Sequence, residues 1–178
     1  MSSVPSSVVV RDVGPRDGLQ PEAPVAVEGR VRLIEALVAA GVTRIEAVAF
    51  VSPKAVPAMS GAAEVLASVG RPEGVRLSAL VPNVKGAELA LAETVDELTV
   101  TISISETYNQ RNVRMSTDES EVVIGSICST AGAVPVDAVV SCAFGSPYEG
   151  EVAPAAAAQI EPITTSDSLV LMRTLRWL

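Results

Sequence analysis

Short apolar runs recur along the chain and are separated by longer, more polar segments. Each run is rich in Val, Ile or Leu and is bounded by turn-forming residues such as Gly, Pro, Asp and Ser. Runs with these flanks are typical of buried β-strands. The pattern predicts six strands, at Val8–Arg11, Arg44–Val48, Val75–Leu80, Glu97–Ile102, Val136–Ser141 and Ser168–Leu171.

The segments between the apolar runs have the spacing of amphipathic helices. From Val27 to Ala40 the apolar side chains recur every three or four residues, and Gly41 follows as a suitable C-cap. Asp118 and Glu119 lie near the start of another such segment, where a helix dipole favours negative charge. Further helices are predicted at Ala62–Val69, Val84–Ala92, Thr117–Ala131 and Pro154–Glu161.

Strands that alternate with helices predict a parallel sheet with right-handed crossovers, and the fold class is therefore α/β. Periodicity leaves open whether the sheet is doubly wound or a (β/α)8 barrel. The Rossmann fingerprint and the P-loop are both absent, which weakens the nucleotide-binding doubly wound alternative. Polar residues follow the predicted strands, as in a barrel enzyme.

Five cationic side chains also follow predicted strands. In a parallel sheet they would share one rim, although charged residues favour loops in any fold. They are Arg16, Lys54, Lys85, Arg111 and Arg114.

Composition narrows the classes of partner. The 178 residues are 48% hydrophobic and 19% charged, and 13 basic against 21 acidic residues give a net charge of −8. This balance argues against a nucleic-acid partner, because binding phosphates requires clustered positive charge. No apolar run reaches the length of a membrane span, and the first residues lack the pattern of a signal peptide. We therefore expect a cytoplasmic protein.

Cysteine and histidine usage restricts the available chemistry. Cys128 and Cys142 lack CxxC spacing, so neither a disulfide framework nor a structural zinc site is indicated, and we expect both to be small buried residues. The chain contains no histidine. A mechanism that uses imidazole would need residues outside this sequence.

The segment Val13–Gln20 (VGPRDGLQ) directly follows the first predicted strand. Its two glycines and its proline force a tight turn, which would hold Arg16 and Asp17 at the carboxyl end of that strand. An arginine that binds an anion and a carboxylate that binds a metal would then lie together. Alternatively, Arg-Asp-Gly is an ordinary solvated turn.

Three segments together resemble the 3-hydroxy-3-methylglutaryl-coenzyme A (HMG-CoA) lyase family: Val13–Gln20, Ile45–Met59 (IEAVAFVSPKAVPAM) and Val140–Gly150 (VSCAFGSPYEG). Related aldolases and synthases share an Arg-Asp-Gly turn, but the longer GPRDGLQ and FVSPK forms are more specific. The segment from Ser105 to Asn112 also resembles the family's loop after strand four. The resemblance extends from about Val8 to Gly150.

The resemblance implies a (β/α)8 TIM barrel that cleaves an acyl-CoA substrate, HMG-CoA, to acetoacetate and acetyl-CoA with Mg²⁺ or Mn²⁺, a reaction of leucine degradation and ketone-body formation. A guanidinium and a hard cation suit the negative charge that develops on an enolate. By this resemblance Arg16 stabilises the enolate, Asp17 ligates the metal, and Glu46 orients Arg16 or assists proton transfer. A structural ion pair is the alternative role for Glu46.

The resemblance also implies a set of substrate-binding residues, which are Arg16, Gln20, Ser52, Lys54 and Asn112. The family's other metal ligands, two histidines and an asparagine, would lie beyond residue 178, as would its catalytic cysteine loop. Neither cysteine of this chain lies in that loop's motif. We therefore expect residues 1–178 to form one incomplete barrel domain of about six βα units.

Six of eight strands leave two sheet edges open, so we expect this chain to be unstable alone. Because the remaining metal ligands and the cysteine loop are missing, we expect it to be inactive alone. A homo-oligomer is a further expectation. Three hypotheses stay open: part of an HMG-CoA lyase, part of a related metal-dependent aldolase or acyl-CoA synthase, or a non-catalytic fragment with an interaction role.

Overall fold

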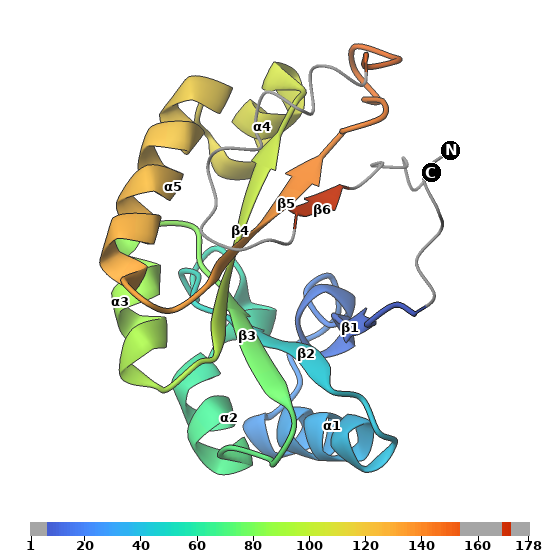
Figure 1. Cartoon of the computed structure of the whole chain (residues 1–178), viewed down its shortest axis with the longest axis vertical. Helices are drawn as coiled ribbons and strands as arrows, with labels where there is room; N and C mark the ends of the chain where they lie inside the picture. Colours follow the sequence, from blue (N-terminus) through green and yellow to red (C-terminus); the bar gives the residue numbers. More distant parts are fainter. Residues whose placement is uncertain (1–6, 154–168, 172–178) are drawn as a thin grey trace.

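The computed structural model of the chain describes residues 7–153 and 169–171. Its centre is a six-stranded sheet in which every neighbouring pair is parallel and the strands follow one another in chain order (Figure 1). The strands are β1 (Arg11–Asp12), β2 (Arg44–Ala49), β3 (Arg76–Leu80), β4 (Glu97–Ser103), β5 (Val136–Ser141) and β6 (Leu169–Leu171).

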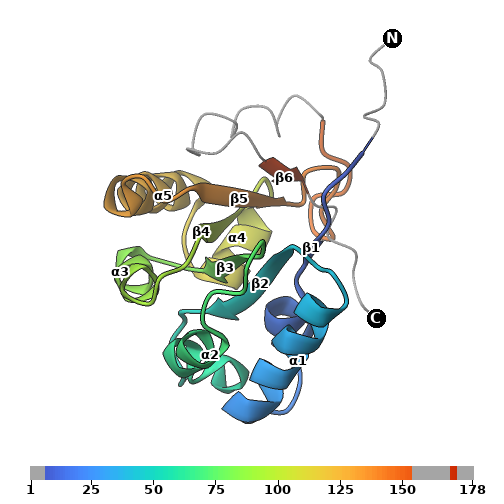
Figure 2. The same ribbon diagram turned by 60° about the horizontal axis from the view of Figure 1, so that its bottom comes forward.

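Helices connect the strands and cover one side of the sheet. They are α1 (Val27–Ala39), α2 (Ala62–Val69), α3 (Val84–Ala92), α4 (Glu106–Val113) and α5 (Thr117–Ala131), with short helical turns η1 (Gly14–Gly18) and η2 (Pro57–Met59). Figure 2 shows α1, α2, α3 and α5 on the convex side of the curved sheet. A doubly wound sheet changes strand order and carries helices on both faces, so the sequential order and one-sided cover identify an open barrel.

Most predicted elements are confirmed to within one or two residues at each end. The first strand was predicted wrongly: it comprises Arg11–Asp12 rather than Val8–Arg11, and the side chains of Val8, Val9 and Val10 are 69–77% exposed. A segment of high strand propensity forms a strand only where it pairs with a neighbouring strand. Here β1 pairs with β2 through two residues only. The predicted helix Pro154–Glu161 lies outside the described residues.

Helix α4 was not predicted, because its polar sequence has no apolar face and was interpreted as a loop. Its first turn is held instead by a cap: the Ser105 hydroxyl accepts a hydrogen bond from Tyr108 N at 3.0 Å. Local capping by Ser105 therefore stabilises the start of α4, although its sequence has no apolar pattern that predicts a helix.

The hydrophobic core lies between the convex face of the sheet and the helices. Alternate strand residues face outward onto buried helix residues, as period-two alternation requires. This core includes Ile45, Ala47, Leu77, Ala79, Leu98, Val100, Ile102, Val136, Ala138 and Val140 from the strands, and Ile34, Val65, Leu66, Ala87, Ala90, Ile124 and Ile127 from the helices.

The strand residues that alternate with these core residues face the concave side of the sheet and are mostly polar. They include Arg44, Glu46, Ser78, Glu97, Thr99 and Asp137, of which all but Arg44 are buried. Branched apolar residues usually fill the centre of a (β/α)8 barrel. In this chain the concave face offers charged and hydroxyl groups instead. Among the residues that the structure describes, no helix combines the length and apolarity needed to cross a bilayer.

Candidate active site at the carboxyl ends of the strands

The turn that carries Arg16 follows β1 immediately and is very tight. The backbone N–H groups of Arg16, Asp17 and Gly18 all donate to the carbonyl of Val13, at 3.2, 2.7 and 3.3 Å. The bonds from Gly18 N to Val13 O and from Leu19 N to Gly14 O each span five positions, which makes this segment a single π-helical turn. The tight turn predicted from the glycines and the proline is confirmed, and it directs Arg16 inward, where 9% of the residue is exposed.

Arg16 forms a buried ion pair with the neighbouring strand. Its Nε donates to Oε1 of Glu46, a β2 residue that is 1% exposed. Its Nη1 donates to Asp17 Oδ1 at 2.7 Å and contacts Gln20 Oε1 at 3.4 Å. The structure therefore brings together four of the residues selected from the sequence, with one guanidinium at their centre.

The loop after β2 packs against the same turn. Leu19 joins a small apolar cluster with Val51, Val56 and Met59, so the end of η1 rests on this loop. The side chains of Ser52 and Lys54 are exposed there, and the Ser52 carbonyl accepts hydrogen bonds from the backbone of the next turn. The turn after β1 and the loop that holds Ser52 and Lys54 therefore lie side by side at one rim of the sheet.

Asn112 does not join this cluster. It is exposed on α4, whereas Asn109 of the same helix is 1% exposed. Asn109 Oδ1 accepts from Ser103 N at 3.1 Å, and its Nδ2 lies 3.0, 3.0 and 2.7 Å from Met115 O, Ser116 O and Ser120 Oγ. Sequence reasoning missed this residue, although its spacing of four from Ser105 places both on one side of a helix.

A second polar cluster, the loop latch, joins the loops after β4 and β5. We define it as Ser105, Thr107, Ser146 and Glu149. The Glu149 carboxylate accepts hydrogen bonds from the hydroxyls of Ser105 and Ser146, and its Oε1 from Thr107 N at 3.3 Å. These donors lower the pKa of Glu149 to about 2.

Next to the loop latch, the Arg111 guanidinium lies 4.6 Å from the ring centre of Tyr148. Arg111 belongs to α4 and Tyr148 to the loop after β5. This contact is a second connection between the same two loops. Its only signal in the sequence was the SPYEG block, which contains Tyr148 and Glu149.

Asp17 has the chemistry of a ligand for a hard cation, since its carboxylate side chain is 55% exposed at the rim. The described residues contain no cluster of three or more His, Cys, Asp or Glu side chains that could hold a metal ion. Asp17 therefore has the chemistry of one ligand for Mg²⁺ or Mn²⁺, and no further acidic, histidine or cysteine cluster accompanies it within the described residues.

The two cysteines differ in burial. Cys142 is fully buried, as expected, while Cys128 is only half-buried. Burial raises the pKa of the Cys128 thiol, which lowers its reactivity.

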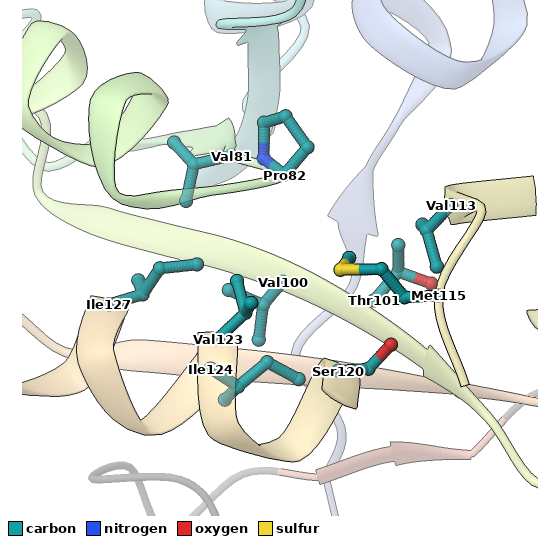
Figure 3. A pocket seen from close by; sticks show the side chains of 10 residues that line it. All are labelled: Val81, Pro82, Val100, Thr101, Val113, Met115, Ser120, Val123, Ile124 and Ile127. Carbon is teal, nitrogen blue, oxygen red and sulfur yellow. The ribbon is translucent and has the colours of Figure 1, made fainter. Parts of the chain in front are cut away.

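A small apolar pocket lies behind the sheet, between β4 and α5 (Figure 3). It has room for about one water molecule. Its lining is almost entirely apolar, and it contains none of the residues of the Arg16 cluster. The site chemistry is therefore at the rim and not in this pocket.

Known proteins resemble this chain in sequence and in fold. Residues 7–165 match the HMGL-like family. A Pseudomonas aeruginosa protein, 3-hydroxy-3-isohexenylglutaryl-CoA/hydroxymethylglutaryl-CoA lyase, is 43% identical over 155 residues, which cover 85% of this chain and 52% of the relative.

Solved structures of HMG-CoA lyases have the same fold. The Pseudomonas aeruginosa enzyme superposes with a TM-score of 0.85 at 41% identity, covering 89% of this chain and 54% of the other. The Acinetobacter baumannii enzyme, solved with coenzyme A and 3-methylmalate, gives 0.84 at 33% identity, covering 92% and 54%. The chain thus spans about half the length of the relatives it matches, and the predicted barrel class is confirmed.

Proposed function

Because the chain belongs to the HMGL-like family, we propose that it contributes the first half of a carbon–carbon lyase that cleaves HMG-CoA to acetyl-CoA and acetoacetate. The names of its relatives support this reaction and its acyl-CoA substrate. The observation that carries the proposal is the buried pair of Arg16 and Glu46 at the rim, with Asp17 beside it.

The proposed reaction breaks the bond between the carbon that bears the tertiary hydroxyl and the carbon next to the thioester. The hydroxyl loses its proton and becomes the ketone of acetoacetate. The electron pair of the broken bond moves onto the thioester as an enolate, which is protonated to acetyl-CoA. The group that most needs stabilisation is therefore the developing enolate oxygen.

Arg16 is arranged to stabilise that oxygen. Its Nε and Nη1 are occupied by Glu46, Asp17 and Gln20, and Nη2 makes no hydrogen bond within the described residues. Nη2 is thus left to donate to substrate. Glu46 accepts from Nε, which favours its role in orienting the guanidinium over a role in proton transfer.

When bound, Mg²⁺ or Mn²⁺ would polarise the substrate oxygens as a Lewis acid. We propose Asp17 as one of its ligands. The exposed side chains of Ser52 and Lys54 are proposed to contact the acyl-CoA. Asn112, which is exposed on α4, stays a prediction for the same substrate.

An assay of acetyl-CoA release tests the function. The protein assayed should include residues 1–178 and the remaining length found in the relatives, and HMG-CoA is the substrate. We expect Arg16→Lys to lower turnover by about 10²–10³-fold, because an ammonium cannot reproduce a planar fork that holds three partners. The matched control is Arg32→Lys on the exposed face of α1, which should keep wild-type turnover.

The outcomes separate the hypotheses. Wild-type turnover in Arg16→Lys would make Arg16 a structural residue of the turn. Cleavage or condensation of 2-oxo acids in place of HMG-CoA cleavage would indicate the related aldolases and synthases. The 178-residue chain alone is expected to show no turnover.

A second substrate is favoured by one observation. The Pseudomonas aeruginosa relative, at 43% identity, is named for an isohexenylglutaryl thioester as well as for HMG-CoA. Comparing kcat/KM for the two thioesters in the same assay would decide between them. A cytoplasmic location and homo-oligomerisation stay predictions, which cell fractionation and sedimentation would test.

A further inference from the structure

The segment that carries Arg16 and Asp17 is held by very little backbone pairing. Strand β1 is two residues long and aligns with β2 only at Arg11↔Arg44 and Asp12↔Ile45. So short a strand provides few ladder hydrogen bonds to fix the turn that follows it. The position of Arg16 must therefore depend on side-chain contacts of this segment.

One set of these contacts comes from Arg11, the first residue of β1. Its Nη2 donates to Oε1 of Glu97 and to Oδ2 of Asp137, and Arg44 Nη2 donates to the other oxygen of Glu97. The side chains of Glu97 and Asp137 are 3% and 0% exposed, and that of Arg11 is 13% exposed. Two arginines and two carboxylates thus form one nearly buried network of alternating charge. We call it the barrel-floor network and define it as Arg11, Arg44, Glu97 and Asp137.

The barrel-floor network crosses the concave face of the sheet. Glu97 begins β4 and Asp137 is in β5, whereas Arg11 is in β1 and pairs with neither strand. Two strands separate β1 from β4, and three separate it from β5. Contact is possible only because the sheet curls (Figure 2). In a closed eight-stranded barrel, strand five lies opposite strand one.

We infer that Arg11 is a positioning residue that fixes the turn bearing Arg16 and Asp17 by anchoring β1 to the far wall of the barrel. Arg11 lies five residues before Arg16, at the end of β1 that is farther from the turn. It has no part in the proposed chemistry. Its importance for catalysis rests on the proposed function, but its effect on the turn is a property of this chain alone.

The alternative is that the barrel-floor network only adds to overall stability. Buried ion pairs often contribute little net stability, since desolvation offsets their attraction, although removing one partner is costly. The two roles differ in which amides lose protection from hydrogen exchange when Arg11 is replaced. A positioning role loosens the turn more than the core, whereas a purely global role affects all protected amides alike.

Amide hydrogen exchange of the 178-residue chain, measured by NMR, distinguishes them. The probes are the N–H groups of Arg16, Asp17 and Gly18 in the turn, and the reference is Leu98 N, which donates to Pro135 O at 2.9 Å between β4 and β5. In Arg11→Met we expect the turn amides to exchange about tenfold faster relative to that reference.

Two variants serve as matched controls. Arg11→Lys should keep the turn within about threefold of wild type, because one nitrogen of Arg11 makes both contacts and an ammonium can replace it. Arg76→Met removes an arginine from the same level of β3, where the side chain is exposed, and should change neither rate.

Uniform acceleration of turn and reference amides in Arg11→Met would overturn the inference. If that variant does not fold, Asp137→Asn, which keeps the size of the side chain and removes its charge, takes its place with the same expectation. Failure of both to fold would assign the network to the global fold and also overturn the inference. Because no step of this test measures turnover, its result is independent of the proposed lyase activity.

Discussion

At the scale of single residues, neighbouring polar side chains of one short helix have quite different roles. Asn109 and Asn112 are three positions apart on α4, and only Asn109 is buried. Its amide oxygen and its amide nitrogen both form hydrogen bonds, with the end of β4 and the start of α5 respectively. Asn109 therefore connects three elements, whereas Asn112 faces solvent.

We expect Asn109→Ala to lower the free energy of unfolding by about 2–4 kcal/mol, because it leaves buried backbone groups without partners. The matched control Asn112→Ala should change it by less than about 0.5 kcal/mol, as is usual for exposed positions. Urea denaturation of the three proteins measures both values. Equal effects of the two substitutions would show that the amide network of Asn109 is not needed for stability.

At the scale of elements, side chains join two of the loops that form the rim. The loop latch joins the loop after β4 to the loop after β5 through the Glu149 carboxylate. Ser105 also caps α4, so one hydroxyl both begins a helix and holds the latch. Loops positioned in this way keep a shape that short connections alone would not fix.

The loop latch has a defined pH dependence. The pKa of Glu149 is about 2 in the folded chain against an ordinary 4.5, so its contribution is fully present above 4.5 and is lost as the pH falls towards 2. We expect Glu149→Gln to lower the thermal midpoint at about pH 6 and to have a smaller effect at about pH 3.

Glu151→Gln is the control for this prediction, since Glu151 is an exposed acid of the same loop. Its effect should be small at both pH values. A Glu149→Gln effect that is the same at both pH values would mean that the carboxylate charge has no part in the loop latch. Differential scanning calorimetry of the three proteins provides the comparison.

At the scale of the whole molecule, the described part of the chain is one wall of a barrel. Its polar concave face carries the barrel-floor network at one end and the Arg16 cluster at the other. The chain spans about half the length of its relatives, and Asp17 is the one metal ligand that the resemblance assigns to it.

We therefore expect the 178-residue chain to bind Mn²⁺ only weakly. A single carboxylate replaces few of the water ligands of a hydrated cation, so binding gains little free energy. Titration calorimetry with wild type and Asp17→Asn measures this. A Kd of about 1 µM or tighter would contradict the assignment of the remaining ligands to other residues. A weak site that survives Asp17→Asn would show that Asp17 is not the ligand.

Local pattern determined much of this fold. Helices α2, α3 and α5 and strand β5 begin and end where apolar spacing, Gly and Pro predicted. The Arg16 turn was predictable for the same reason, since its glycines and proline restrict the backbone whatever the surroundings. The family resemblance then indicated Glu46 as a partner of Arg16, and the structure places the two in contact.

Tertiary structure decided what depends on residues far apart in the chain. Arg11 meets Glu97 and Asp137 across 86 and 126 positions, and nothing local to Arg11 indicates either partner. The apolar run at Val8–Val10 failed to form a strand because a strand requires pairing as well as propensity. The sequence by itself thus determined the elements and the turn that carries Arg16, while the curvature of the sheet determined which charges meet on its concave face.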